Sequence, residues 1–181
     1  EVKLLLLGTG ESGKSTIFKQ VRIIHKKGYD DEERKKFIPT IHGNVYVCAK
    51  ALIKAVEKFG LEFESGEVAA LAERIKATHM SDYSLSPERG EEILSLWNSS
   101  VVRTAFERRS EFQLYDSCEY FLSDLKRVAA ADYLPTTEDV LRCRVKTVGI
   151  TELEFPIKGM NFRIVDVGGQ RNERRKVQLR R

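Results

Sequence analysis

Apolar residues near the two ends of the chain show the patterns of β-strands. Residues 2–7 are an apolar run that a glycine ends, which predicts a buried strand. Near the other end, apolar residues in 150–157 and 161–167 alternate with polar or shorter ones, and Gly159 lies between the two segments. This spacing predicts a β-hairpin whose second strand leads to Asp166.

Helical periods dominate the rest of the chain. Residues 14–27 are expected to form a helix with Ile17, Val21 and Ile24 on its inner face. From about residue 30 to residue 134 the pattern is helical throughout and carries no strand signal. These residues therefore predict a helical bundle of their own.

The bundle opens with its clearest pattern. Asp30 followed by Glu33 is a capping-box sequence. Across residues 37–59, apolar residues recur at steps of three and four, which indicates one continuous amphipathic helix. Pro39 lies inside this pattern and is expected to bend the helix early. Trp97 lies on a later apolar helical face and is expected to be a core residue.

These patterns divide the chain of 181 residues into two domains. Residues 1–29 and 135–181 are predicted to form an α/β domain with at most three strands here. Residues 30–134 are predicted to form an all-helical domain inserted into it. The length suits one domain or two small ones, and a hydrophobic content of 41% suffices for a core.

Composition argues against several classes of protein. The three cysteines have no C-x-x-C spacing and the three histidines are scattered, which argues against a disulfide framework or a zinc site. No signal peptide and no apolar run long enough to span a bilayer is present. The net charge of +4 comes largely from a basic cluster after residue 170. We interpret this cluster as a solvated tail; a nucleic-acid or membrane patch is the alternative, but aromatic residues do not accompany it.

Residues 8–15 carry the most informative motif, GTGESGKS, which fits G-x-x-x-x-G-K-[ST]. Its glycines allow successive backbone N–H groups to surround an anion, and the following helix adds its positive N-terminal end. Lys14 is expected to reach the β- and γ-phosphates, and the Ser15 hydroxyl to bind Mg²⁺. The motif predicts a site for a nucleotide triphosphate; a glycine-rich turn before a helix is the alternative.

A later segment points to the same chemistry. Asp166 ends a predicted strand, where its carboxylate would approach Mg²⁺ directly or through a water. Gly169 has no side chain to keep its N–H from a γ-phosphate, and the Gln170 amide could orient an attacking water. These are parts that phosphoryl transfer requires, although a tight turn would use the same glycines.

Together the segments resemble the α subunits of heterotrimeric G proteins. The resemblance is carried by GESGKST at 10–16, RCRVKT at 142–147 and DVGGQR at 166–171, with further likeness at 116–117 and 133–135. It covers nearly the whole chain. It implies an α/β fold: a P-loop GTPase (Ras-like) domain, incomplete here, with an inserted all-α domain that small GTPases lack.

The resemblance also implies roles for individual residues. Arg144 would stabilise charge on the transferred phosphoryl group, and Gln170 would position the attacking water. Ser15 and Thr147 would bind Mg²⁺. The residues implied in binding GTP or GDP are Glu11, Ser12, Gly13, Lys14, Ser15, Thr16, Asp116, Ser117, Leu141, Arg142, Arg144, Thr147, Asp166, Gly168, Gly169 and Gln170.

Several of these residues also have a plain structural interpretation. Asp116 with Glu119 fits a capping box. Arg142 and Arg144 would point the same way in an extended segment, so their spacing alone does not choose between them. Thr147 could be a β-branched residue that enters a strand.

The function implied is a GTP-hydrolysing switch that couples receptors to effectors in transmembrane signalling. Its partners would be a G protein βγ dimer, a G protein-coupled receptor, regulators of GTP hydrolysis and an effector. The full-length family is expected at the cytoplasmic face of the plasma membrane, through segments missing here, and the chain alone in the cytoplasm. A truncated, non-catalytic interaction fragment and an unrelated phosphate-loop ATPase or kinase are the alternatives.

The sequence departs from the family pattern in its last part. The Asn-Lys-x-Asp motif that reads guanine is absent, so guanine specificity rests on the resemblance. The pattern is lost after Lys176, which suggests a truncated product. Three strands would leave residues 2–7 and 162–167 partly uncovered, and we expect the helical block to be the more stable part.

Overall fold

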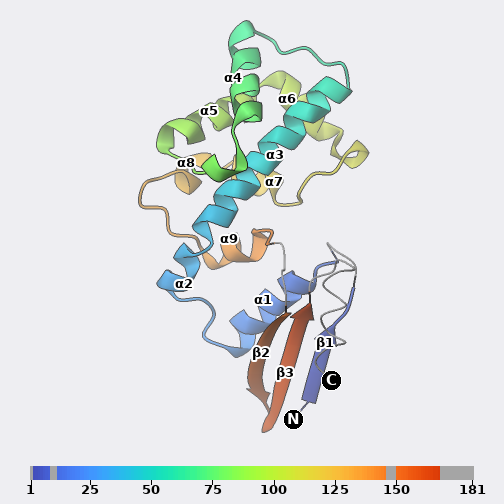
Figure 1. Ribbon diagram of the computed structural model, residues 1–181, viewed down its shortest axis with the longest axis vertical. Coiled ribbons are helices and arrows are strands. Elements are labelled where there is room, and N and C mark those ends of the chain that lie inside the picture. The colour runs from blue at the N-terminus through green and yellow to red at the C-terminus, as the bar shows by residue number, and fades with distance from the viewer. Residues whose placement is uncertain (1, 9–11, 146–149, 168–181) are drawn as a thin grey trace. The chain divides into compact units, whose positions relative to one another are not determined.

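The computed structural model describes residues 2–8, 12–145 and 150–167. The fold is mixed α/β and mostly helical, with a small three-stranded sheet (Figure 1). The chain divides into two compact units, Glu1–Arg34 with Thr136–Arg181, and Lys35–Pro135. We call the first the sheet unit and the second the helical unit, and describe each by itself.

The sheet unit is built on a sheet with the strand order β1-β3-β2. Its strands and helices are β1 (Val2–Leu6), β2 (Ile150–Ile157), β3 (Met160–Val167), α1 (Lys14–His25), α2 (Asp31–Lys35) and α9 (Thr137–Arg142). β2 and β3 pair antiparallel, so the predicted hairpin is confirmed. β1 pairs parallel to β3 with Leu6 opposite Asp166, so the carboxyl ends of both strands lie at the same edge.

β1 is less buried than its apolar sequence predicts. Leu4 and Leu5 are 42% and 44% exposed, and Leu7, just beyond the strand, is 74% exposed. The expectation of a buried strand is wrong because β1 is an edge strand of the described sheet, with β3 as its neighbour there. The expectation that these strands are partly uncovered is confirmed at β1.

α1 confirms the predicted helix but not its predicted inner face. Ile17 and Ile24 are 49% and 72% exposed, whereas Lys19 is buried. The buried Lys19 side chain contacts the carbonyls of Val140 and Cys143, neighbours that periodicity alone does not identify.

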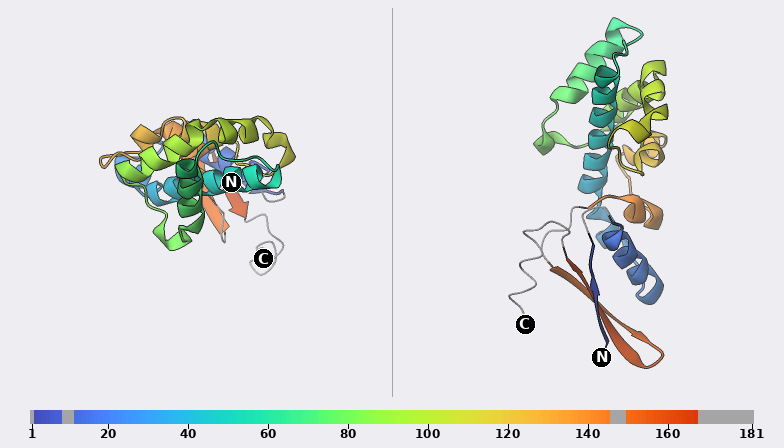
Figure 2. Two further views of the ribbon diagram at one scale, coloured as in Figure 1. Left: turned by 90° about the horizontal axis from the view of Figure 1, so that it is seen from above. Right: turned by 90° about the vertical axis from the view of Figure 1, so that its right-hand side faces the viewer.

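The helical unit is all-helical, and every residue from 35 to 135 is described. Its elements are α3 (Ile38–Lys58), α4 (Gly66–Ala77), η1 (Met80–Asp82), α5 (Pro87–Asn98), α6 (Ser100–Glu107), η2 (Arg109–Glu111), α7 (Cys118–Leu122) and α8 (Leu125–Val128). The long helix α3 contacts α4, α6 and α7 (Figure 2). Trp97 is 2% exposed and meets Phe106 edge to face, which confirms it as a core residue.

The start of the bundle is partly as predicted. The Asp30–Glu33 capping box is confirmed: the Glu33 N–H donates to Asp30 Oδ1 at 2.8 Å, and the Asp30 N–H donates to Glu33 Oε2 at 3.2 Å. It begins the short helix α2, which ends at Lys35, while α3 begins at Ile38. The bend expected at Pro39 in one continuous helix is wrong, because Pro39 occupies the first turn of α3, where its missing N–H forfeits no helical bond.

No helix within the described ranges is both long enough and apolar enough to cross a membrane.

Candidate functional site

The described part of the phosphate-loop motif leads directly into α1. Gly13 has a φ of 82°, in the left-handed region that favours glycine, and it is the N-cap of the helix. A glycine N-cap has no side chain to accept a hydrogen bond from the first turn, and that turn contains no acidic residue. The first N–H groups of α1 and its positive end therefore suit an anion.

The lysine of the motif lies across the loop. Lys14 Nζ donates to the Gly8 carbonyl and to Ser12 Oγ, each at 3.1 Å. A Cβ at Gly8 would lie 2.4 Å from Ser12 Oγ, so a larger residue there would require the Ser12 side chain to move. The ammonium group is thus held at the same end of α1 as the first N–H groups of the helix, where both would face a phosphate.

A serine and an aspartate from opposite ends of the chain meet beside this loop. Ser15 Oγ donates to Asp166 Oδ2 at 2.9 Å, and Asp166 is only 3% exposed. The parallel register of β1 and β3 explains the contact, because Asp166 lies opposite Leu6, at the edge from which the loop leaves. A hydroxyl and a carboxylate are hard oxygen donors of the kind that Mg²⁺ prefers, so the donor set fits that ion.

Clusters typical of other metals do not occur in the part of the chain that the structure describes. No group there brings together three or more His, Cys, Asp or Glu residues able to hold a metal ion. A cation at Ser15 and Asp166 would therefore need further oxygen ligands, such as those of a phosphate.

One buried lysine close to these residues, Lys19, was missed by the sequence analysis. Its Nζ donates to the carbonyls of Val140 at 2.8 Å and Cys143 at 2.5 Å, and the side chain is only 7% exposed. Burial lowers the pKa of Lys19 from its usual value, although the nearby Cys143 opposes this shift. A lysine is normally exposed on a helix, and no signal in the sequence marks this one. It ties α1 to the end of α9.

The helix α9 was also missed, although the sequence holds its signal. Thr136 and Asp139 form a capping box, with bonds of 3.1 Å and 2.8 Å between each side chain and the other's N–H. Arg142 is the last residue of α9, and its Nε pairs with Glu138 one turn earlier. Arg142 and Arg144 therefore do not share one extended segment, the case in which their side chains would point the same way.

The residues after α9 lead to the predicted catalytic arginine. Cys143 is buried, and burial raises the pKa of its thiol to about 11, so the thiol stays neutral and is a poor nucleophile at pH 7. Arg144 follows it and is half-buried, as is Leu141 on α9. Through Lys19, the backbone just before Arg144 is fixed to the helix that begins in the phosphate loop.

Two predicted nucleotide contacts belong to the helical unit. Ser117 is buried and is the N-cap of α7, while Asp116 is exposed. The alternative capping box of Asp116 with Glu119 is wrong, because a turn closed by a 2.9 Å bond from the Cys118 N–H to the Tyr115 carbonyl places Ser117 at the cap.

The structure thus brings together the loop residues at the start of α1 (Ser12, Gly13, Lys14, Ser15 and Thr16) and Asp166. Five further predicted residues of this site lie outside the described residues: Glu11, Thr147, Gly168, Gly169 and Gln170.

Residues 1–178 match the family model described as G-protein alpha subunit. The match covers nearly the whole chain and includes both the loop before α1 and the segment that follows β3. The resemblance found in the sequence is confirmed.

Proposed function

Because the chain belongs to the G-protein α-subunit family, we propose that it binds guanine nucleotide and hydrolyses GTP as a molecular switch. The family is one of GTPases that bind guanine nucleotide and Mg²⁺. The observation that carries the proposal for this chain is the 2.9 Å contact of Ser15 with Asp166. It joins the phosphate loop to the end of β3, where a cation and a phosphate would be held together.

In this proposal the two units have separate tasks. The sheet unit corresponds to the Ras-like GTPase domain, expected from the sequence at 1–29 and 135–181. The helical unit corresponds to the inserted all-α domain, expected at 30–134. Asp116 and Ser117 would contribute to the nucleotide site from the helical side, as the family resemblance implies.

The proposed roles of single residues are those that the family resemblance implies. Lys14 and the N–H groups at the start of α1 hold phosphate, and Ser15 and Thr147 hold Mg²⁺. When bound, Mg²⁺ neutralises charge on the phosphates. Arg144 stabilises the charge that develops on the transferred group, and Gln170 orients the attacking water. An arginine supplied in cis is a known property of the family, and Arg144 takes this role by resemblance.

The family implies βγ and receptor partners. We extend the proposal to regulators of GTP hydrolysis and to an effector, at the cytoplasmic face of the plasma membrane.

Nucleotide binding is tested by titrating the purified chain with fluorescent GTP and ATP analogues, with and without Mg²⁺. We expect saturable, Mg²⁺-dependent binding of the GTP analogue. Lys14→Ala should abolish it, whereas Lys27→Ala, at an exposed lysine, should leave it unchanged. Preference for ATP would contradict the proposal, and absence of binding to the unaltered chain would favour the non-catalytic interaction role.

Hydrolysis is tested by single-turnover measurements on nucleotide-loaded chain. Arg144→Ala should slow hydrolysis by about 10²-fold or more, the usual effect of removing one group that stabilises transition-state charge. Lys27→Ala, the control used for binding, should hydrolyse at nearly the unaltered rate. Gln170→Leu should slow hydrolysis while binding is kept, and loss of binding in that variant would count against the assigned role.

A further inference from the structure

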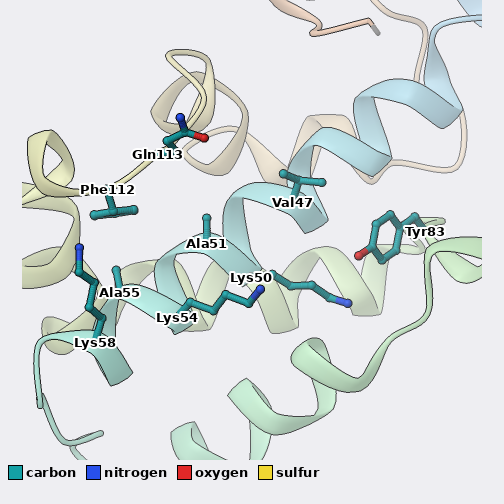
Figure 3. A pocket seen from close by; sticks show the side chains of 9 residues that line it. All are labelled: Val47, Lys50, Ala51, Lys54, Ala55, Lys58, Tyr83, Phe112 and Gln113. Carbon is teal, nitrogen blue, oxygen red and sulfur yellow. The ribbon is translucent and has the colours of Figure 1, made fainter. Parts of the chain in front are cut away.

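A groove in the helical unit lies apart from every residue assigned a role above. It has a volume of about 430 Å³ and runs along α3 (Figure 3). Val47, Ala51 and Ala55 form its floor, and their spacing of four places them on one face of the helix. Tyr83 lies at one end of the groove and Phe112 at the other.

Both aromatic walls are fixed by a second aromatic ring from α3 or its C-terminal end. Tyr83 stacks on Tyr46 with centroids 4.6 Å apart and an interplanar angle of 4°. Phe112 meets Phe59 edge to face at 6.0 Å. The walls are therefore held in place without a ligand, which reduces the entropy lost on binding.

A row of lysines follows the floor along α3, one turn apart. The two outer lysines contact the segments that carry the walls. Lys50 Nζ donates to the Thr78 carbonyl at 2.5 Å and lies 5.0 Å from the centroid of the Tyr83 ring. Lys58 Nζ donates to the carbonyl of Glu111, the residue before Phe112, at 2.9 Å. The central lysine, Lys54, is exposed and has no hydrogen bond or ion pair within the described part of the chain.

Nearby carboxylates do not neutralise this lysine, because they are paired elsewhere. Glu111 accepts two hydrogen bonds of 2.8 Å from Arg108, and Glu57 pairs with Lys76 at 2.6 Å. Acidic residues outnumber basic ones across residues 35–135, so the positive charge at the groove is local. A negatively charged membrane surface, which would meet the whole face of the unit, is accordingly disfavoured.

We propose that this groove binds an acidic amphipathic helix of a partner protein. An apolar stripe on that helix would cover the floor from Val47 to Ala55, which spans about two turns or roughly 12 Å. Carboxylates at the edge of the stripe would pair with Lys54 and the lysines beside it. The mode of recognition is an amphipathic helix laid in a groove, with charge complementarity setting its preference.

The probe for the test is a labelled, alanine-based 14-residue peptide with two Leu residues four apart and a Glu three residues after each Leu. A second peptide carries Lys in place of Glu. Fluorescence anisotropy with the full chain should show saturable binding of the acidic peptide, with a Kd of about 10–100 μM, and much weaker binding of the basic one.

Lys54→Glu should weaken binding of the acidic peptide by about tenfold or more and reverse the preference between the peptides. Lys126→Glu makes the same charge change at an exposed residue of α8, outside the groove, and should leave binding unchanged. Ala51→Phe should fill the floor and prevent binding of both peptides. Thermal unfolding followed by circular dichroism verifies that each variant is folded.

Equal binding of the two peptides, or binding unaffected by Lys54→Glu, would overturn the proposal. So would Lys54-dependent binding to phosphatidylserine vesicles without peptide binding, which would assign the groove to a membrane. Lys54-dependent dimerisation in sedimentation experiments without peptide binding would assign it to a second copy of the chain.

Discussion

Among single residues, Lys19 combines a charged group with burial. Its ammonium group is buried, yet two carbonyls at the end of α9 accept its hydrogen bonds. A cation at the C-terminal end of a helix is also favoured by the partial negative charge there. The residue therefore links two helices at the proposed site by satisfying polar groups that would otherwise be buried alone.

Replacing Lys19 should loosen this link. Lys19→Met keeps the length of the side chain but leaves the carbonyls of Val140 and Cys143 without their partner, which should ease local opening of α9 by about 2 kcal/mol. Trypsin should then cleave after Arg142 and Arg144 at least about tenfold faster, as measured by mass spectrometry of the fragments. Lys27→Met, at an exposed lysine, is the control, and equal cleavage rates in the two variants would contradict the role of Lys19.

His42 should make the stability of the helical unit depend on pH. Its Nε2 lies 3.2 Å from the Val128 carbonyl, and its Nδ1 accepts from the Leu85 N–H at 3.1 Å, so the neutral ring is satisfied on both sides. Burial lowers the pKa of His42, although the bond to Val128 opposes this shift. Between that pKa and the usual value of about 6.5, the unfolded chain binds more protons.

The free energy of unfolding should therefore fall as the pH is lowered through about 6.5 and level off below the folded-state pKa. Urea unfolding from pH 8 to pH 5 measures this, followed by fluorescence of Trp97, the single tryptophan, which lies in the same unit. His42→Gln should flatten the dependence in this range. An unchanged slope in that variant would show that other groups are responsible.

At the scale of elements, close packing of α5 against α8 depends on a glycine. A Cβ at Gly90 would lie 2.4 Å from the Cβ of Ala129 and 3.5 Å from the Leu125 carbonyl. Gly90→Ala should therefore destabilise the helical unit by about 1–2 kcal/mol, despite the better helix propensity of alanine. Urea unfolding measures the change.

Two further variants make this prediction specific. Gly66→Ala, in the first turn of α4, adds the same methyl group where no atom lies within 4 Å, and should be neutral or slightly stabilising. Ala129→Gly in the Gly90→Ala background should recover part of the loss by removing the atom that clashes. Equal effects of the two glycine substitutions would indicate helix propensity rather than packing.

Local signals in the sequence predict elements better than they predict which face is covered. The hairpin and α1 were predicted because alternation, glycine placement and helical period are properties of short segments. The exposure of the Ile17 and Leu4 side chains was not predicted, because burial depends on which elements become neighbours. Pro39 shows the same limit: whether it bends a helix or begins one is decided by where the preceding helix stops.

The proposed site shows a similar division. The phosphate-loop motif predicts Lys14 and Ser15 because the anion-binding geometry is local to one short segment. The Ser15–Asp166 contact required the parallel register of β1 with β3, which joins distant segments. Lys19 has no local signature, since its role arises from two carbonyls more than a hundred positions away.

For the whole molecule, apolar exposure is unevenly distributed between the two units. Seven large hydrophobic residues of the sheet unit are exposed in the described ranges, against Met80 in the helical unit; they are Leu4, Leu5, Leu7, Ile17, Ile24, Val145 and Met160. Less apolar surface is thus buried where the nucleotide site is proposed, and the core of the helical unit is the more complete.

Hydrogen exchange should therefore differ between the units. Amides of α3 should exchange only when the whole helical unit unfolds, which is rare. Amides of β1 should exchange faster, through a local opening that costs less free energy. Exchange followed by NMR or mass spectrometry at pH 7 measures this. If the proposed function holds, GTP with Mg²⁺ should slow exchange in β1 and leave α3 nearly unchanged. Uniform protection in the two units without nucleotide would contradict the difference in stability.

The separation of β1 and β3 along the chain also affects the order in which the two units fold during synthesis. Phe162 is translated about 160 residues after its partner Val2, so the two strands can pair only after both have left the ribosome. Residues 35–135 emerge in that interval and contain all the contacts of their own unit. The helical unit is therefore expected to fold before β1 pairs with β3. The Ser15–Asp166 contact is expected to form only after β3 has been translated.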